Sequence, residues 1–198
     1  MREDTFVYTI GNKAYINLTN RCTNACDFCI RNYADGVEDY YLWLSREPSV
    51  DEIIALLPDV TAFEEIVFCG YGEPTMRADD VVAIARYIKA NNGKTRINTN
   101  GQAELITGDA NITKKFADCI DVMSISLNEA TAEKYDAICH SKYGKSAYAA
   151  LIDFARHCVE QGIRTKFSVM ETIGTEDIEK CREIANSVGA ELRVRTMI

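Results

Sequence analysis

The chain has 198 residues, of which 47% are hydrophobic and 26% are charged. This length and composition predict one folded domain, residues 1–198, with a sizeable core, and they exclude disorder as the main state. Lysine and arginine number 22 against 30 aspartate and glutamate residues, which gives a formal net charge of −8. Such a charge disfavours bulk electrostatic binding to nucleic acid, although a local basic groove stays possible.

The chain shows no sign of membrane insertion or secretion. No uninterrupted apolar run approaches the roughly 18 to 20 residues that a membrane span needs. The first five residues include two acids, where a signal peptide has basic residues followed by an apolar stretch. We therefore predict a cytoplasmic protein that does not contact a membrane. In that reducing compartment, clustered thiols among the eight cysteines indicate metal binding more often than disulfides.

Strand and helix patterns alternate along the whole chain. The strands Thr5–Ile10 and Ala14–Leu18 flank a Gly-Asn turn and predict an N-terminal β-hairpin. The elements predicted after it, in chain order, are helix Val50–Leu57, strand Glu65–Cys69, helix Asp80–Ala90, strand Thr95–Asn98, helix Ile112–Ala117, strand Asp121–Leu127, helices Ala130–Ile138 and Ser146–Gln161, strand Arg164–Val169, helix Glu176–Val188 and strand Glu191–Arg195.

This alternation predicts an α/β fold with a parallel sheet and helices outside it. Six strand–helix units of about 30 residues fall two short of a closed eight-fold barrel. An open partial (β/α)6 barrel, the three-quarter TIM type with an N-terminal hairpin, therefore competes with a flat doubly wound sheet. Both arrangements place ligands at the carboxyl ends of the strands.

Three cysteines lie close together in the loop that follows the first core strand. Cys22, Cys26 and Cys29 have the spacing Cys-x3-Cys-x2-Cys, so their thiolates can converge on one metal cluster. A cubane iron–sulfur cluster has four irons and usually four cysteine ligands, and three thiolates would leave one iron open to another ligand. Structural zinc normally needs four ligands, and no paired Cys or His motif lies elsewhere. A zinc site completed by a distant residue, or three incidental cysteines, remain the alternatives.

With Phe28 as its aromatic residue, the pattern Cys-x3-Cys-x-aromatic-Cys resembles the signature of the radical S-adenosylmethionine (radical SAM) superfamily. The resemblance implies a partial β/α barrel and one 4Fe–4S cluster held by the three cysteines. It also implies that SAM chelates the open iron and that one electron cleaves SAM to methionine and a 5′-deoxyadenosyl radical. Reduced flavodoxin or ferredoxin is the electron donor that this resemblance implies.

Later strand ends carry further motifs of the same family. The segment from Gly70 to Pro74, Gly-Tyr-Gly-Glu-Pro, is similar to the Gly-Gly-Glu-Pro motif, which assigns Gly72 and Glu73 to the ammonium group of SAM. The segment Asn98-Thr99-Asn100-Gly101 resembles a Thr-Asn-Gly strand ending and places Asn98 and Asn100 near polar groups of SAM. By the same resemblance, Ser126 and Asn128 serve the ribose and methionine parts. Taken alone, the first two segments would be a glycine-rich turn and an Asn-Gly turn.

The residues outside these motifs are less informative. The cysteines at 69, 119, 139, 158 and 181 show no paired spacing and are predicted to be core residues, so we expect a single cluster. Arg193 and Arg195 alternate along the last strand and either point inward to a carboxylate or form exposed ion pairs. The aromatic segment Tyr33–Pro48 either caps the barrel mouth or covers the end of the core.

The motif order also resembles a compact group of radical SAM proteins that are associated with TatD-type nucleases, a name that specifies no reaction. The leading prediction is thus a radical SAM enzyme that abstracts hydrogen from an unidentified substrate. Alternatives are an activase that installs a glycyl radical on a partner, a small-molecule enzyme of deazapurine synthesis, an iron–sulfur electron carrier and a zinc-stabilised binding domain. An open six-strand barrel favours a protein partner or large substrate at its mouth.

Overall fold

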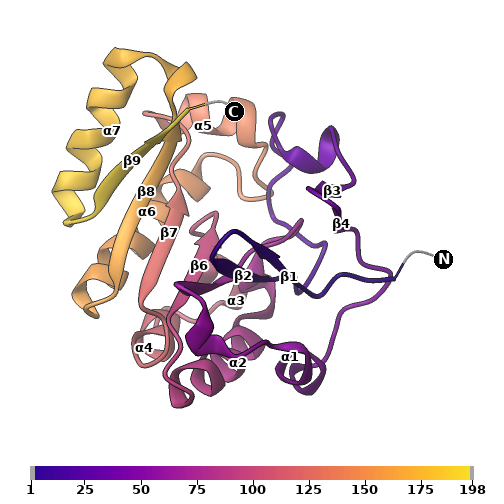
Figure 1. The fold of residues 1–198 in the computed structure, drawn as a ribbon. Coiled ribbons are helices and arrows are strands. Elements are labelled where there is room, and N and C mark those ends of the chain that lie inside the picture. Colours follow the sequence, from indigo (N-terminus) through magenta and orange to yellow (C-terminus); the bar gives the residue numbers. More distant parts are fainter. Residues whose placement is uncertain (1–2, 197–198) are drawn as a thin grey trace.

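The computed structural model describes residues 3–196, so residues 1–2 and 197–198, the two ends of the predicted domain, lie outside the described residues. A seven-stranded sheet in the order β1-β2-β5-β6-β7-β8-β9 forms the centre of the molecule (Figure 1). Only β1 runs antiparallel to its neighbour. The strands are β1 Val7–Ile10, β2 Lys13–Ile16, β5 Glu65–Phe68, β6 Thr95–Thr99, β7 Val122–Ser126, β8 Arg164–Met170 and β9 Glu191–Arg195.

The helices lie along the outside of this sheet (Figure 1). Their buried apolar residues and those of the strands form one hydrophobic core. The first helix begins with the capping box that the sequence predicts, since Ser49 and Glu52 each accept a backbone hydrogen bond from the other. The helices are α1 Val50–Leu56, α2 Ala78–Ala90, α3 Ala103–Thr107, α4 Ile112–Ala117, α5 Ala132–Cys139, α6 Ser146–Glu160 and α7 Thr175–Val188.

The strand order distinguishes the two sheets that the sequence left open. From β1 to β9 the spatial order follows the chain order without a reversal. A doubly wound sheet needs a point at which the order reverses, because its helices cover both faces. This sheet has no such point, so all its helices lie on one side and the predicted partial (β/α)6 barrel with an N-terminal hairpin is confirmed.

Strand alternation gives the sheet an outer face toward the helices and an inner face away from them. On β7, Met123 and Ile125 are fully buried in the core, while Ser124 and Ser126 face inward and are half-buried. Residues paired across parallel strands share a face, so the inner face continues through the residues paired with these serines. Those residues are Asn98 on β6, Lys166 and Ser168 on β8, and Glu191 and Arg193 on β9.

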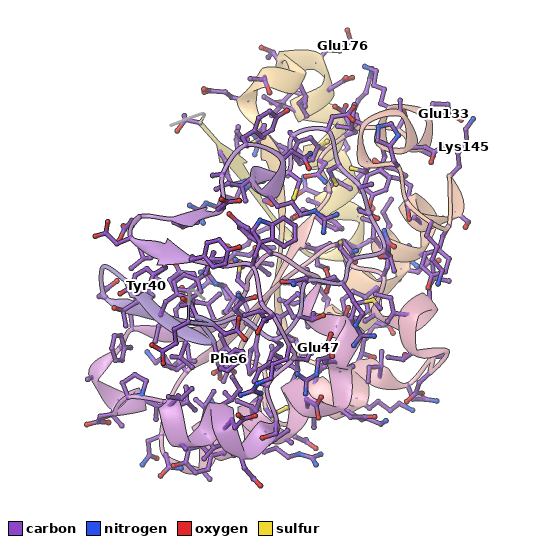
Figure 2. The ribbon with its side chains drawn as sticks, turned by 90° about the vertical axis from the view of Figure 1, so that its right-hand side faces the viewer. Phe6, Tyr40, Glu47, Glu133, Lys145 and Glu176 are labelled. Carbon is purple, nitrogen blue, oxygen red and sulfur yellow. The ribbon has the colours of Figure 1, made fainter. Side chains whose placement is uncertain are left out.

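The aromatic segment Tyr33–Pro48 contains a small hairpin that the sequence did not predict, made of β3 (Gly36–Val37) and β4 (Tyr40–Tyr41). Each of its strands has two residues, which is too short for a periodic pattern. Tyr40 of β4, labelled in Figure 2, packs against Tyr8 of β1 with ring centroids 5.4 Å apart. Tyr8, Leu42 and Tyr71 are the buried members of this second apolar cluster. The segment therefore covers the hairpin end of the sheet and contacts Tyr71 in the loop after β5.

A short helix, α3, was also missed by the sequence analysis, because five residues span little more than one helical turn. Among residues 3–196, none of the helices has the combination of length and apolarity that crossing a bilayer requires.

Candidate functional site

The predicted cluster ligands lie in the loop that follows β2. Cys22, Cys26 and Cys29 are free thiols and each is half-buried. The backbone N–H of Asn24 donates to Cys22 Sγ over 3.4 Å, and burial together with the nearby Glu73 raises the pKa of Cys22 to about 11. A thiol with such a pKa holds its proton at neutral pH, so metal binding would displace it.

Backbone hydrogen bonds fix the cysteine loop to the end of α5. Ala25 N–H donates to Cys139 O and Asp27 N–H donates to Ile138 O, both over 3.0 Å. Lys142 N–H then donates to Thr23 O over 2.8 Å. Two segments more than 100 residues apart in the chain thus share a short ladder of backbone bonds, which holds the loop in one conformation.

A buried polar network connects the same loop to the end of β6. Asn100 Nδ2 donates to Thr23 Oγ1 over 2.8 Å, and Thr23 Oγ1 donates to Gln102 Oε1 over 2.7 Å. Gln102 Nε2 donates to Asn24 Oδ1 over 2.8 Å, and Asn24 Nδ2 donates to the Tyr135 hydroxyl over 2.9 Å. All five side chains are buried. These buried hydrogen bonds connect the loop to the segment after β6 and to α5, and so orient it.

Sequence reasoning selected Asn100 but missed Gln102 and Tyr135. Gln102 comes two residues after Asn100, and its position just beyond the Thr-Asn-Gly ending was the available signal. Tyr135 carried none, since an aromatic residue in a helix is usually part of the core. Asn100 Nδ2 also lies 3.9 Å from Cys22 Sγ, so this side chain contacts a predicted cluster ligand.

Glu73 is buried, with 3% of its surface exposed. Its Oε1 accepts from Thr75 N–H at 3.0 Å and from the Thr75 and Thr99 hydroxyls, each at 2.7 Å. Its Oε2 accepts from Asn100 N–H at 2.7 Å. Burial raises the pKa of this carboxyl, and the four hydrogen bonds oppose the rise. The carboxylate therefore joins the ends of β5 and β6, while its role toward SAM stays a prediction.

Gly70 and Gly72 allow two loops to approach each other closely. A Cβ atom on Gly70 would lie 2.0 Å from Asn17 Oδ1, and one on Gly72 would lie 2.3 Å from Thr19 O and 2.6 Å from Arg21 O. Glu73 N–H donates to the same Arg21 oxygen over 2.8 Å. The absence of a side chain at Gly72 thus serves the contact with the cysteine loop, and the loop after β5 is held directly beside Cys22.

The other predicted SAM contacts lie on the inner face of the sheet, in the cysteine loop and after β7. Asn98 and Ser126 lie on the inner face, where Asn98 opposes the rise that burial gives to the pKa of the Cys69 thiol. Phe28 lies within the cysteine loop and is 44% exposed. Asn128 lies beyond the end of β7 at Ser126 and adopts a left-handed backbone with φ of 63°, while its role toward SAM stays a prediction. Its Nδ2 donates to Cys139 Sγ over 3.3 Å, so it does not continue the row of Ser124 and Ser126.

Cys139 neighbours Cys26, and its thiol together with burial raises the pKa of Cys26. We nevertheless expect Cys139→Ala to keep the full iron content, because the loop is held through the Cys139 carbonyl, which alanine retains. The measurement is iron and sulfide content after anaerobic reconstitution, with Cys119→Ala, another buried cysteine, as the matched control. Loss of iron from a folded Cys139→Ala protein alone would show that Cys139 is a cluster ligand.

The donor set fits a thiolate-bound cluster. Within the described part of the chain, no three Cys, His, Asp or Glu side chains converge on the position of one metal ion. A cubane cluster does not require such convergence, because each thiolate binds a different iron. Three half-buried thiols on one loop, beside the polar ends of β5 and β6, could supply three of the four ligands of such a cluster and leave one iron for another ligand.

Comparisons with known proteins agree with the motifs of this site. The sequence model of the Radical SAM superfamily matches residues 16–188, and a search of curated proteins finds no match. Streptococcus suis SuiB bound to precursor peptide SuiA is similar in structure, with a TM-score of 0.68 and 17% identity over 96% of this chain and 40% of SuiB. A radical SAM methyltransferase from Sphaerobacter thermophilus gives 0.61 and 14% over 96% and 68%. The protein anSMEcpe with bound AdoMet gives 0.60 and 14% over 93% and 50%.

The chain therefore spans less than half the length of SuiB and half that of anSMEcpe, and at these identities the likeness establishes the fold. The family match rests on the sequence and runs from the end of β2 to the end of α7. It includes the cysteine loop and the ends of β5, β6 and β7. The chain belongs to the radical SAM superfamily, whose members use a 4Fe–4S cluster and SAM.

Proposed function

We propose that this chain is a radical SAM enzyme in which Cys22, Cys26 and Cys29 hold one 4Fe–4S cluster. When bound, the cluster and SAM together supply a 5′-deoxyadenosyl radical that abstracts hydrogen from the substrate. The observation that carries the proposal is the cysteine loop itself, with three free half-buried thiols fixed by hydrogen bonds to the ends of β6 and α5. An electron carrier has no need of the polar strand ends that surround this loop.

The described residues have two proposed roles at this site, which are to bind SAM and to hold the surrounding loops. The Gly72 backbone and the inner-face side chains of Asn98 and Ser126 are proposed to bind SAM, together with Asn128. Glu73 is proposed to accept from the ammonium group of SAM, with Asn100 near its polar groups. Both residues also hold the loops that present these groups, since they already bond within the protein. Phe28, which lies between Cys26 and Cys29 in the loop, is proposed to pack against bound cofactor.

The substrate is proposed to be a protein partner or another large molecule. A six-strand barrel leaves β9 as an open edge, and a radical site must be kept from water, so a large substrate could close the gap. The structure of SuiB contains a bound precursor peptide, and this binding is a property of SuiB. An activase that acts on a glycyl-radical partner is one form of this proposal. We also propose that the chain belongs to the TatD-associated group, that it is cytoplasmic and that flavodoxin or ferredoxin reduces it.

The deciding experiment is anaerobic reconstitution with iron and sulfide, followed by dithionite and SAM. We expect 5′-deoxyadenosine and methionine in equal amounts, with none from Cys29→Ala treated in the same way. A reconstituted protein that takes up iron and is reduced but never cleaves SAM would instead be an electron-transfer module. A protein that retains zinc and no iron would be a binding domain.

A further inference from the structure

The inner face of β9 carries positive charge that the described residues do not neutralise. Arg193 and Arg195 pair across the ladder with Ser168 and Met170 of β8. This register places both arginines on the face that holds Ser124 and Ser126, away from the helices. Arg195 lies opposite the last residue of β8, at the carboxyl end of the sheet where the cysteine loop and the predicted SAM contacts lie.

The acidic residues of this face are already engaged. Glu65 pairs with Lys13 at 2.7 Å and with Arg96 at 3.3 Å. Glu191 pairs with Arg164 at 2.8 Å and with Lys166 at 3.7 Å. Arg193 and Arg195 form no ion pair within residues 3–196, in a chain whose net charge is −8. Arg193 and Arg195 therefore form a local positive patch in an acidic protein.

Arg195 is also poorly solvated. Its Nε is buried and has no hydrogen-bond partner among the described residues. Burial lowers the pKa of Arg195, and the neighbouring charge of Arg193 lowers it further. The charge of Arg195 also lowers the pKa of the Cys69 thiol directly after β5, so the two side chains influence each other electrostatically. A buried guanidinium N–H without an acceptor destabilises the folded protein unless an anion accepts its hydrogen bond.

We infer that Arg193 and Arg195 form an anion-binding subsite that receives a carboxylate or phosphate group of the substrate. A guanidinium presents a planar set of donors that matches both groups. The position suits a substrate rather than SAM, because Arg193 shares a row with Ser126 but lies two strands away, about 10 Å at the usual strand spacing. This inference deepens the proposed function and rests on it.

The test uses the reconstituted protein, labelled with nitrogen-15, and inorganic phosphate or acetate as the probe. The Nε–H signals of the arginines are followed during each titration, and SAM affinity is measured by calorimetry on the same samples. The variants are Arg195→Gln and Arg193→Gln. Arg182→Gln is the matched control, because Arg182 is exposed on α7 and pairs with Glu179, and its loss changes the net charge equally.

We expect at least one probe to shift the Arg195 signal in the wild-type protein. Comparing the titrations with phosphate and with acetate shows whether the subsite prefers a phosphate or a carboxylate group. Arg195→Gln should bind that probe about tenfold or more weakly, while Arg182→Gln should bind it with wild-type affinity. The affinity for SAM should be unaltered in both variants. Arg195→Lys, which keeps the charge, should retain part of the binding and serves if the Gln variant does not fold.

Equal probe affinity in Arg195→Gln and Arg182→Gln would overturn the inference. A tenfold loss of SAM affinity in Arg195→Gln would also overturn it, since the arginine would then serve the carboxylate of SAM. These outcomes are separate from failure of the proposed function. In that case 5′-deoxyadenosine would be absent from the wild-type protein whatever the titrations show.

Discussion

Each of the variants Cys22→Ala, Cys26→Ala and Cys29→Ala is expected to contain only trace iron after anaerobic reconstitution and to cleave no SAM. Three thiolates from one loop leave no spare ligand, so losing one frees a second iron that SAM cannot also occupy. The loop itself should stay in place, because its bonds to α5 are made by the backbone of Ala25 and Asp27. The effect is therefore on the cluster and not on the fold.

The measurements are iron and sulfide content, the cluster absorption and the yield of 5′-deoxyadenosine. Cys69→Ala is the matched control for iron content, since Cys69 is also a free, half-buried thiol at a strand end but lies outside the loop. Circular dichroism checks that every variant is folded. Full iron content in any one of the three loop variants would contradict the ligand assignment.

The second large effect is expected from Glu73→Ala, whose free energy of unfolding should fall by about 3 kcal/mol or more. A buried donor left without an acceptor costs about 1–3 kcal/mol, and Glu73 accepts four hydrogen bonds from Thr75, Thr99 and Asn100. Water that enters the space left by the side chain would recover part of this cost. Urea unfolding measures the change. Glu176→Ala, which removes an exposed carboxylate, should stay within about 0.5 kcal/mol of the wild-type protein.

The same variant should bind SAM about tenfold to a hundredfold more weakly, which corresponds to the loss of about 1.5–3 kcal/mol for a hydrogen bond to a charged group. Asn128→Ala, measured in parallel, tests the second predicted contact. If both variants bind SAM with wild-type affinity, the predicted position of SAM is wrong. A loss of SAM affinity in Glu73→Ala with unchanged stability would mean that the carboxylate contacts the ligand and contributes little to joining β5 and β6.

The sequence by itself determined the elements and the ligand-bearing loop. Strand and helix periodicity depends on neighbouring residues, so β9 was predicted with the bounds it has and α1 with its capping box. The Cys22–Cys29 spacing is likewise local, because the three thiols lie within eight consecutive residues of one loop. For these elements and this loop the signal lay within a few residues of its effect, so the sequence was sufficient, whereas the short β3, β4 and α3 gave no periodic signal.

Tertiary structure alone decided how these parts meet. Gln102 and Tyr135 contact the cysteine loop across 78 and 111 positions of the chain, and only the packing of α5 beside the end of β6 brings them there. The motif around Glu73 predicted a ligand contact, yet the fold surrounds its carboxylate with internal donors. The inward direction of Arg195 follows from its register with Met170. Such contacts depend on strand register and helix packing, which distant residues set together and no short motif encodes.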